Sequence, residues 1–312
     1  MNQSFNKKLV SFTLISMFMM LSASFVMASG KVVLYSAHKQ AIIDAMIPLF
    51  EKKTGINAEV IKAGSGDIIN RANAEKGNPQ ADVIWSIGGE QLEASSDILQ
   101  KYTPKDANKI DPVFMVGTNW LPYTAIVNVF IVNKNQLNSS EYPRTWPDLG
   151  RSNLKGRISS ARADKSGSSY MQLATVLTIY GDKGWDVYKP ILQNFVLSGS
   201  SSAVPRFVND GEAAVGVTLE DNAYKYVQGG GPVEIVYPED GTVAAPDGIA
   251  LVKNGPNSQN GKIFIDWALS KETQDFLVQE MGRRPIRTDV SASGDLPPLS
   301  SFKVVPYYFS CS

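Results

Sequence analysis

The 312-residue chain carries 30 basic and 30 acidic side chains, so it has no formal net charge. This balance gives no reason to expect nucleic acid or an anionic membrane surface as a partner. The single cysteine, Cys311, lies next to the end of the sequence, so stability must come from hydrophobic cores and not from an intrachain disulfide.

The first residues have the three parts of a secretory signal peptide. Lys7 and Lys8 form a basic start, residues 9–21 are an apolar run, and Val26 and Ala28 occupy the −3 and −1 positions of a cleavage site. The apolar run is shorter than the roughly 20 residues that a membrane span requires. We therefore expect a signal peptide over 1–28 and export to the periplasm. Cleavage removes two lysines, which leaves 28 basic and 30 acidic residues and a net charge of −2.

Residues 31–85 alternate between strand and helix patterns. Gly55 is placed to end the first helix, and Pro48 is expected to kink or split it. The alternation predicts parallel strands with helices on both faces of a sheet. The predicted strands are 31–35, 57–61 and 81–85, and the predicted helices are 41–50 and 67–76.

The same alternation returns in the second half of the chain. In one of its helices, Trp185, Tyr188 and Leu192 are expected to face inward. Large aromatic residues are usually buried, so Trp85, Trp120 and Trp146 are assigned to the core. The predicted strands here are 156–161, 213–217 and 233–237, and the predicted helices are 168–180, 183–195, 202–209 and 221–228.

Two long segments join the two halves. Residues 124–137 form a strand-like run rich in β-branched side chains, and 242–254 run back before further helices over 260–281. This pattern predicts two lobes on a two-strand hinge. The expected boundaries are 31–125 and 248–285 for the first lobe, 130–244 and 286–312 for the second, and 124–132 and 242–250 for the hinge.

Short loops of small polar residues follow most of the predicted strands. Ligands of open α/β sheets bind at the carboxyl ends of the strands, where such loops and helix N-termini converge. Any one loop could simply cap a helix, but six at equivalent edges of two sheets predict a ligand-binding cleft. The loops are 36–38, 64–67, 86–89, 166–168, 198–202 and 218–221.

The loop at 166–168 has the composition of an anion site, because Ser-Gly-Ser before a helix leaves amides and hydroxyls uncovered. Arg162 and Lys165 flank it and either add charge or lie on the surface. Glu220 and Asp221 differ in character: the pair could bind sugar hydroxyls, an ammonium group or a metal, or could begin a helix.

With these loops in place, the chain resembles the type II solute-binding proteins of ABC importers. It resembles the cluster that holds ferric-ion binders and binders of phosphorylated sugars and phosphonates. The resemblance covers essentially the whole mature chain. The stretches that carry it are YSAHKQAIIDAMIPLFEKKTGI, ADVIWS, LKGRISSARADKSGSSY, VNDGEAAVGVTLED and MGRRPIRTDV. It implies an α/β protein with two lobes, each a mostly parallel sheet flanked by helices. The resemblance further implies that the lobes close on a solute and that the protein docks transiently on a membrane permease.

The resemblance also implies two classes of cargo. In the ferric binders, the loop that matches 166–168 holds a phosphate or carbonate anion beside the metal. This sequence lacks their tyrosine pair near Asp221, and Ser86 stands near the position of an expected carboxylate. Because Fe³⁺ prefers phenolate or carboxylate oxygens, the departures favour a phosphorylated organic molecule. The stretches VGVTLED and VYPEDGTVAAPDGIAL also look like the hexose-phosphate binders.

The expected site therefore has one end for the phosphate and one end for the organic part of the ligand. We expect a monomeric protein that needs no cofactor. In the alternative, Fe³⁺ with a synergistic anion, the metal residues are His38, Glu220 and Asp221. The phosphate is expected at Ser166, Gly167, Ser168, Ser65, Gly66, Ser200 and Ser201, the organic part at His38, Glu220 and Asp221, and the near wall at Ser36 and Ser86.

A secreted hydrolase is the remote alternative. Residues 53–55 (Lys-Thr-Gly) and 152–155 (Ser-Asn-Leu-Lys) match fragments of the penicillin-recognising enzymes, but in the wrong order. The sequence has no Gly-x-Ser-x-Gly elbow, and His38 is its only histidine. Because an ordered set of acid and base residues is missing, we expect a binding protein and not an enzyme.

Overall fold

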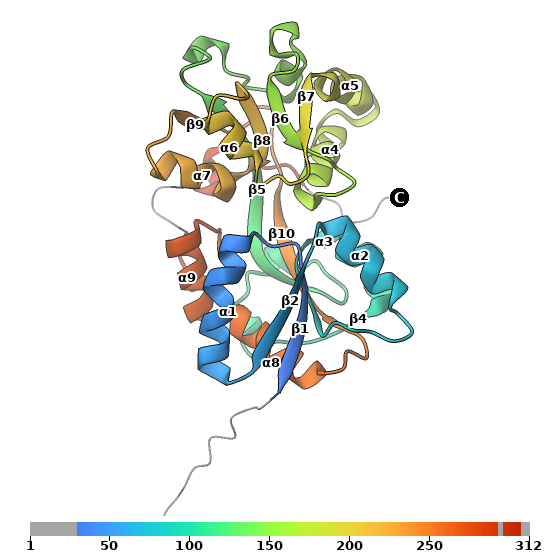
Figure 1. Ribbon diagram of the computed structural model, residues 1–312. Helices are drawn as coiled ribbons and strands as arrows, with labels where there is room; N and C mark the ends of the chain where they lie inside the picture. The colour runs from blue at the N-terminus through green and yellow to red at the C-terminus, as the bar shows by residue number, and fades with distance from the viewer. Residues whose placement is uncertain (1–29, 293–295, 307–312) are drawn as a thin grey trace, which may run out of the picture.

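A computed structural model describes residues 30–292 and 296–306, which form two α/β lobes joined by two long strands (Figure 1). Ten strands of the described chain belong to one sheet that continues from lobe to lobe in the order β2-β1-β3-β10-β5-β8-β6-β7, with β4 paired to β10 and β9 to β5. The predicted signal peptide and Cys311 lie outside the described residues.

The first lobe confirms the β-α-β-α-β prediction. Strand β1 pairs in parallel with β2 on one side and β3 on the other. Helix α1 ends at Gly55, whose φ of 73° is left-handed, and it runs through Pro48 as one helix, so the expected split is wrong. The elements are β1 (Lys31–Ser36), α1 (Gln40–Thr54), β2 (Asn57–Lys62), α2 (Ser65–Ala74), β3 (Val83–Gly88), α3 (Gly89–Ala94) and β4 (Leu99–Gln100).

The second lobe has a parallel core in which β6 lies between β7 and β8. Its elements are β6 (Ile158–Ala161), α4 (Gly167–Tyr180), α5 (Gly184–Asn194), β7 (Phe195–Ser198), α6 (Val204–Asn209), β8 (Val215–Leu219), α7 (Glu220–Gln228) and β9 (Val233–Val236). Of the three residues of α5 that were expected to face inward, only Tyr188 is buried; Trp185 and Leu192 are 50% and 47% exposed. The short edge strand β7 was not predicted.

Strands β5 (Leu121–Asn133) and β10 (Ala244–Val252) run antiparallel to each other and extend into both lobes (Figure 1). After β10, helices α8 (Ser258–Ala268) and α9 (Lys271–Met281) return to the first lobe. The prediction that the second lobe begins again at residue 286 fails for residues 286 and 287 but agrees with the position of Val304. Ile286 packs in the first lobe's core and Arg287 donates to the carbonyl of Leu269, whereas Val304 lies beside Thr242.

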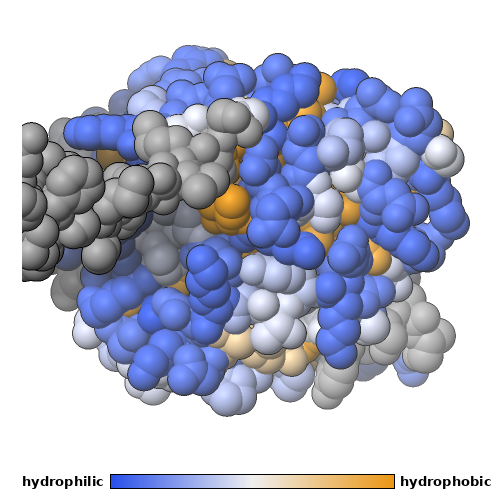
Figure 2. Space-filling model, turned by 90° about the horizontal axis from the view of Figure 1, so that it is seen from below, coloured by the Kyte–Doolittle hydropathy of each residue, from blue (hydrophilic) through white to orange (hydrophobic). Residues whose placement is uncertain are grey.

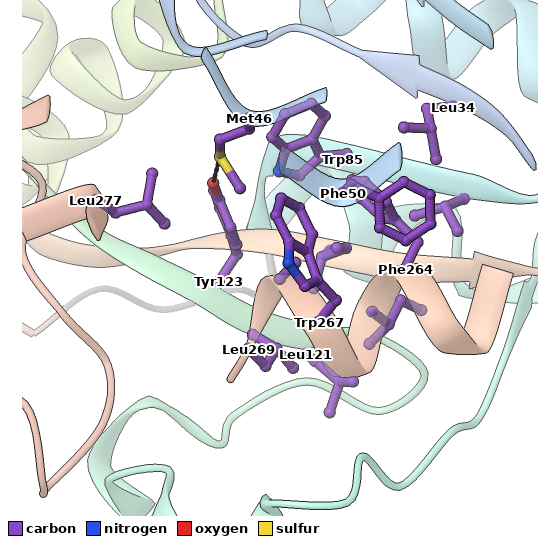
Figure 3. Packing of buried hydrophobic residues seen from close by; sticks show 14 of the residues in the cluster. Leu34, Met46, Phe50, Trp85, Leu121, Tyr123, Phe264, Trp267, Leu269 and Leu277 are labelled. Carbon is purple, nitrogen blue, oxygen red and sulfur yellow. Dashed lines mark hydrogen bonds between the residues drawn. The ribbon is translucent and has the colours of Figure 1, made fainter. Parts of the chain in front are cut away.

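Each lobe has its own aromatic-rich core. In the first lobe, Phe50, Trp85 and Phe264 pack edge to face at 5.1–5.4 Å between ring centroids, and Figure 3 shows them with Trp267 close by. In the second lobe, Phe130 meets Trp146 at 5.0 Å. The prediction that Trp85, Trp120 and Trp146 are core residues is confirmed, since none is more than 3% exposed.

The surface shows no broad apolar face in the view from below, where hydrophilic residues dominate and hydrophobic ones form small separate areas (Figure 2). Over residues 30–292 and 296–306, no helix combines the length and the apolar character that crossing a membrane requires.

A buried carboxylate, Asp82, fixes the far end of the first lobe. Its Oδ2 accepts a hydrogen bond from the amide of Val33 at 2.8 Å and one from Nδ2 of Asn257 at 3.1 Å, and its Oδ1 accepts from the amide of Asn257. One side chain therefore ties the start of β3 to β1 and to the N-terminus of α8.

We predict that Asp82→Ala lowers the free energy of unfolding by about 3 kcal/mol, because it leaves buried donors without an acceptor. Urea unfolding measures the loss. The exposed Asp182 is the control, and Asp182→Ala should change stability by less than about 0.5 kcal/mol. A loss below about 1 kcal/mol for Asp82→Ala would show that water replaces the carboxylate.

Candidate ligand-binding site

A cavity of about 280 Å³ lies between the lobes. Cavities for small ligands commonly measure roughly 300–1,000 Å³, so this one suits a small molecule. The first lobe supplies residues 37–39, 62–65, 86, 88 and 90; the second supplies 165–168, 171, 199–202, 219 and 222; Ile126, Asp247 and Arg283 complete the lining.

Helices α2 and α4 begin at the cavity without side-chain caps, as do α1, α3 and α7, whose N-cap residues Lys39, Gly88 and Leu219 also line it. Gly64 and Ser166 are the N-cap residues of α2 and α4, and neither N-terminus receives a side-chain capping hydrogen bond. The first amides of a helix have no acceptor within the helix. Simple capping, the ordinary explanation for small polar residues here, therefore does not account for these loops.

Serine hydroxyls surround the start of α4. Oγ of Ser168 donates to Oγ of Ser201 at 2.7 Å and lies 3.1 Å from Oγ of Ser166. Ser65, from the first lobe, lies against Gly167, because a Cβ at Gly167 would be 2.9 Å from Oγ of Ser65. Amides and hydroxyls from both lobes thus face one end of the cavity.

The other end contains a buried arginine. Nη1 of Arg283 donates to Asp221 at 3.0 Å, and its Nη2 donates to Thr124 at 2.6 Å and to Asp247. Burial raises the pKa of Asp247, and the charge of Arg283 with the hydroxyl of Ser86, 2.7 Å away, opposes this rise. Ser86 has a φ of 61°, a strained conformation for serine, which holds its hydroxyl toward Asp247.

Asp221 connects the lobes electrostatically. Its carboxylate, on α7 of the second lobe, accepts from Nζ of Lys39 in the first lobe at 2.6 Å and from Arg283. Burial alone would raise the pKa of Asp221, but the charges of Lys39 and Arg283 outweigh it and lower the pKa to about 2. Asp221 is therefore ionised at neutral pH. Its ion pair with Lys39 joins the second lobe to the first.

Eight of the predicted ligand residues line the cavity: His38, Ser65, Ser86, Ser166, Gly167, Ser168, Ser200 and Ser201. Four do not. Ser36 is buried and donates to the carbonyl of Trp85. Gly66 faces the backbone of Asp164.

Glu220 and Asp221 lie behind the lining and not in it. The carboxylate of Glu220 accepts from Nε and Nη2 of Arg284 at 2.7 and 2.8 Å and from the hydroxyl of Tyr237 at 2.5 Å. Asp221 is occupied by Lys39 and Arg283. Neither carboxylate lines the cavity as expected, and internal cations already neutralise both.

Three cationic lining residues were missed. Lys39 directly follows His38, a predicted ligand residue, and Lys62 directly follows the predicted strand 57–61. Both positions could have indicated that these lysines lie at the cavity. Arg283 was a different case, because its position at the end of the span assigned to the first lobe gave no indication that its guanidinium reaches the cavity.

The alternative prediction, a metal site, requires a cluster of metal-binding side chains. Among the residues the structure describes, no group of three or more histidine, cysteine or acidic side chains is placed to hold a metal ion. No tyrosine of residues 30–292 and 296–306 occurs in the cavity lining. The hydroxyl of Tyr123 instead donates to Sδ of Met46 at 3.1 Å (Figure 3).

His38 is held as a neutral ring. It meets Trp85 and Tyr123 edge to face at 4.9 and 5.6 Å, and its Nδ1 accepts a hydrogen bond from the amide of Lys39 at 3.2 Å. Burial, followed by the charges of Arg283 and Lys39, lowers its pKa well below the usual 6.5, while Asp221 opposes them. The proton of the neutral ring therefore resides on Nε2.

This environment predicts a pH effect on stability. Below pH 6.5 the unfolded chain protonates His38 and the folded chain does not, so stability falls as pH falls. His38→Gln should remove up to about 1.4 kcal/mol per pH unit from the slope between pH 5 and 6. Urea unfolding of both proteins across pH 5–7.5 gives the comparison. Equal slopes, or an NMR titration of this single histidine near pH 6.5, would contradict it.

Known proteins are similar to this chain in structure or in sequence. The structure of the periplasmic binding protein AfuA from Actinobacillus pleuropneumoniae, with exogenous fructose-6-phosphate bound, superposes with a TM-score of 0.84 at 28% identity over 90% of this chain and 92% of that one. A putative 2-aminoethylphosphonate-binding periplasmic protein of Salmonella typhimurium is 26% identical over 79% of this chain and 74% of its own length. An Fe(3+)-binding periplasmic protein of Serratia marcescens is 23% identical over 84% and 80%.

The family model described as bacterial extracellular solute-binding protein matches residues 32–283. That span includes residues of both lobes, every lining residue of the cavity, and β5 and β10, the two crossover strands that extend into both lobes. The chain belongs to the bacterial extracellular solute-binding protein family, and it is a periplasmic solute-binding protein of ABC import.

Proposed function

We propose that this protein delivers a phosphorylated small organic molecule, with a sugar phosphate as the favoured class, to an ABC permease. The observation that carries the proposal is the pair of uncapped helix starts, at Gly64 and Ser166, that face one cavity from opposite lobes. The proposal involves no catalytic step.

The serine-rich end suits a phosphate group. Helix N-termini and their free amides attract anions, and each hydrogen bond to a charged oxygen contributes roughly 1.5–3 kcal/mol. Ser65, Ser166, Ser168 and Ser201 add hydroxyl donors, and Lys62 and Lys165 line the same cavity. Phosphate oxygens can accept from all of these groups at once.

The remaining lining suits an organic part with hydroxyl groups. Asp247 in the lining and Asp221 behind it are each bound by Arg283, so neither offers an uncompensated charge for an ammonium group. Ile126, Met171 and Leu219 supply apolar surface. Neutral hydroxyls beside apolar carbons are characteristic of sugars, and AfuA, with fructose-6-phosphate bound, has the same fold.

The test is a thermal-unfolding panel with fructose 6-phosphate, 2-aminoethylphosphonate, inorganic phosphate, and Fe³⁺ with citrate. A ligand at about 100 times its dissociation constant stabilises the folded state by roughly 2.7 kcal/mol. We expect the largest rise in melting temperature with the sugar phosphate. A rise with Fe³⁺ plus citrate alone would overturn the proposal in favour of the metal alternative.

A second prediction separates two adjacent serines of α4. Ser168 lines the cavity, whereas Ser169 is buried and does not. Ser168→Ala should weaken binding of fructose 6-phosphate roughly tenfold or more, because one hydroxyl donor to the phosphate is lost. Ser169→Ala should leave it unchanged. Isothermal titration calorimetry measures both, and equal losses would remove the start of α4 from the site.

A further inference from the structure

Two glycines of the first lobe touch the backbone of the second. A Cβ built on Gly66 would lie 2.6 Å from the carbonyl oxygen of Asp164, and one built on Gly64 would lie even closer to the carbonyl oxygen of Lys165. Real Cβ atoms essentially never approach within 3.0 Å, and backbone cannot swing aside as a flexible side chain can. These positions therefore have no room for a methyl group while the lobes are together.

Within its own lobe, neither glycine is required. Gly64 has φ −66° and ψ 155°, which any residue adopts, and Gly66 lies in the first turn of α2 without a positive φ. The atoms closest to the two added Cβ atoms all belong to the second lobe, apart from an ordinary contact of 3.7 Å between position 64 and Asp67. An alanine at either position would therefore conflict with lobe closure alone.

The contact of these glycines with the second lobe lies at the edge of the cavity, and an ion pair lies beside it. Nζ of Lys165 lies 2.6 Å from Oδ1 of Asp67, across the two lobes, although both side chains are about half exposed. Ser65, between the two glycines, faces Gly167. Figure 1 shows why these segments meet: α4 of the upper lobe lies directly above α2 and α3 of the lower one.

We propose that Gly64 and Gly66 are positioning residues that determine how closely the lobes approach at the serine-rich end of the cavity. Their missing side chains bring Ser65 and residues 166–168 to the same bound group. The proposal rests on the proposed function, in that the group they enclose is the phosphate. Gly64→Ala and Gly66→Ala should weaken ligand binding while leaving the separate lobes intact.

Closure can be read without a ligand by a disulfide between Ser65→Cys and Gly167→Cys. The two Cβ atoms would be 3.4 Å apart, close to the range of natural disulfides. In a Cys311→Ser background these are the chain's only cysteines. The rate at which this pair oxidises measures how often the lobes meet in the closed arrangement.

We expect Gly64→Ala and Gly66→Ala to slow this oxidation roughly tenfold or more. Gly77→Ala is the matched control, because a Cβ there meets nothing within 4 Å. The melting temperature of the reduced, ligand-free variants should stay the same or rise, since alanine restricts the unfolded chain more than glycine does. The dissociation constant for fructose 6-phosphate, measured without the engineered cysteines, should rise by a similar factor.

Equal oxidation rates in all three alanine variants would overturn the proposal. A large drop in melting temperature for Gly64→Ala and Gly66→Ala would also overturn it, because the glycines would then be needed inside the first lobe. Failure of the proposed function gives a different result. The unsubstituted protein would bind neither fructose 6-phosphate nor inorganic phosphate, while the oxidation rates would still depend on the two glycines.

Discussion

The cleft depends on the hydrogen bonds and ion pairs that the guanidinium of Arg283 makes. Arg283 is 2% exposed and binds Thr124 on one crossover strand, Asp247 on the other, and Asp221 at the start of α7. A buried charge is costly unless it is paired and hydrogen-bonded, and Arg283 satisfies two carboxylates that would otherwise be equally costly. Removing it would leave Asp221 and Asp247 buried without their common partner, at the point where the two lobes meet.

The fold was largely predictable because it depends on local patterns. Apolar strands alternate with amphipathic helices, and the parallel pairing of β1 with β2 and β3 follows directly from that order. The errors arose where tertiary context decides. Trp185 and Leu192 have the spacing of a buried helix face but lie on the surface. Ile286 remains in the first lobe's core after α9, although the predicted lobe ended at residue 285.

The site was predictable in part for the same reason. Residues 166–168 and 200–201 line the cavity because loops after parallel strands meet at one edge of a sheet. The roles of Glu220 and Asp221 depend on partners elsewhere in the chain. Arg284 and Lys39 are 64 and 182 residues away from them, and no local pattern reveals such a pairing. A sequence shows that a carboxylate is near a cleft, but the fold decides whether it is already neutralised.

The crossover by paired strands has a consequence for how this protein unfolds. Because β5 contributes to the sheet and to the buried interior of both lobes, neither lobe can lose its structure without exposing an edge of the other. Domains joined by flexible linkers can melt one at a time. Here the two lobes share a hydrogen-bonded ladder, so they should behave as one cooperative unit, and a fragment containing a single lobe would carry an unsatisfied strand edge prone to association.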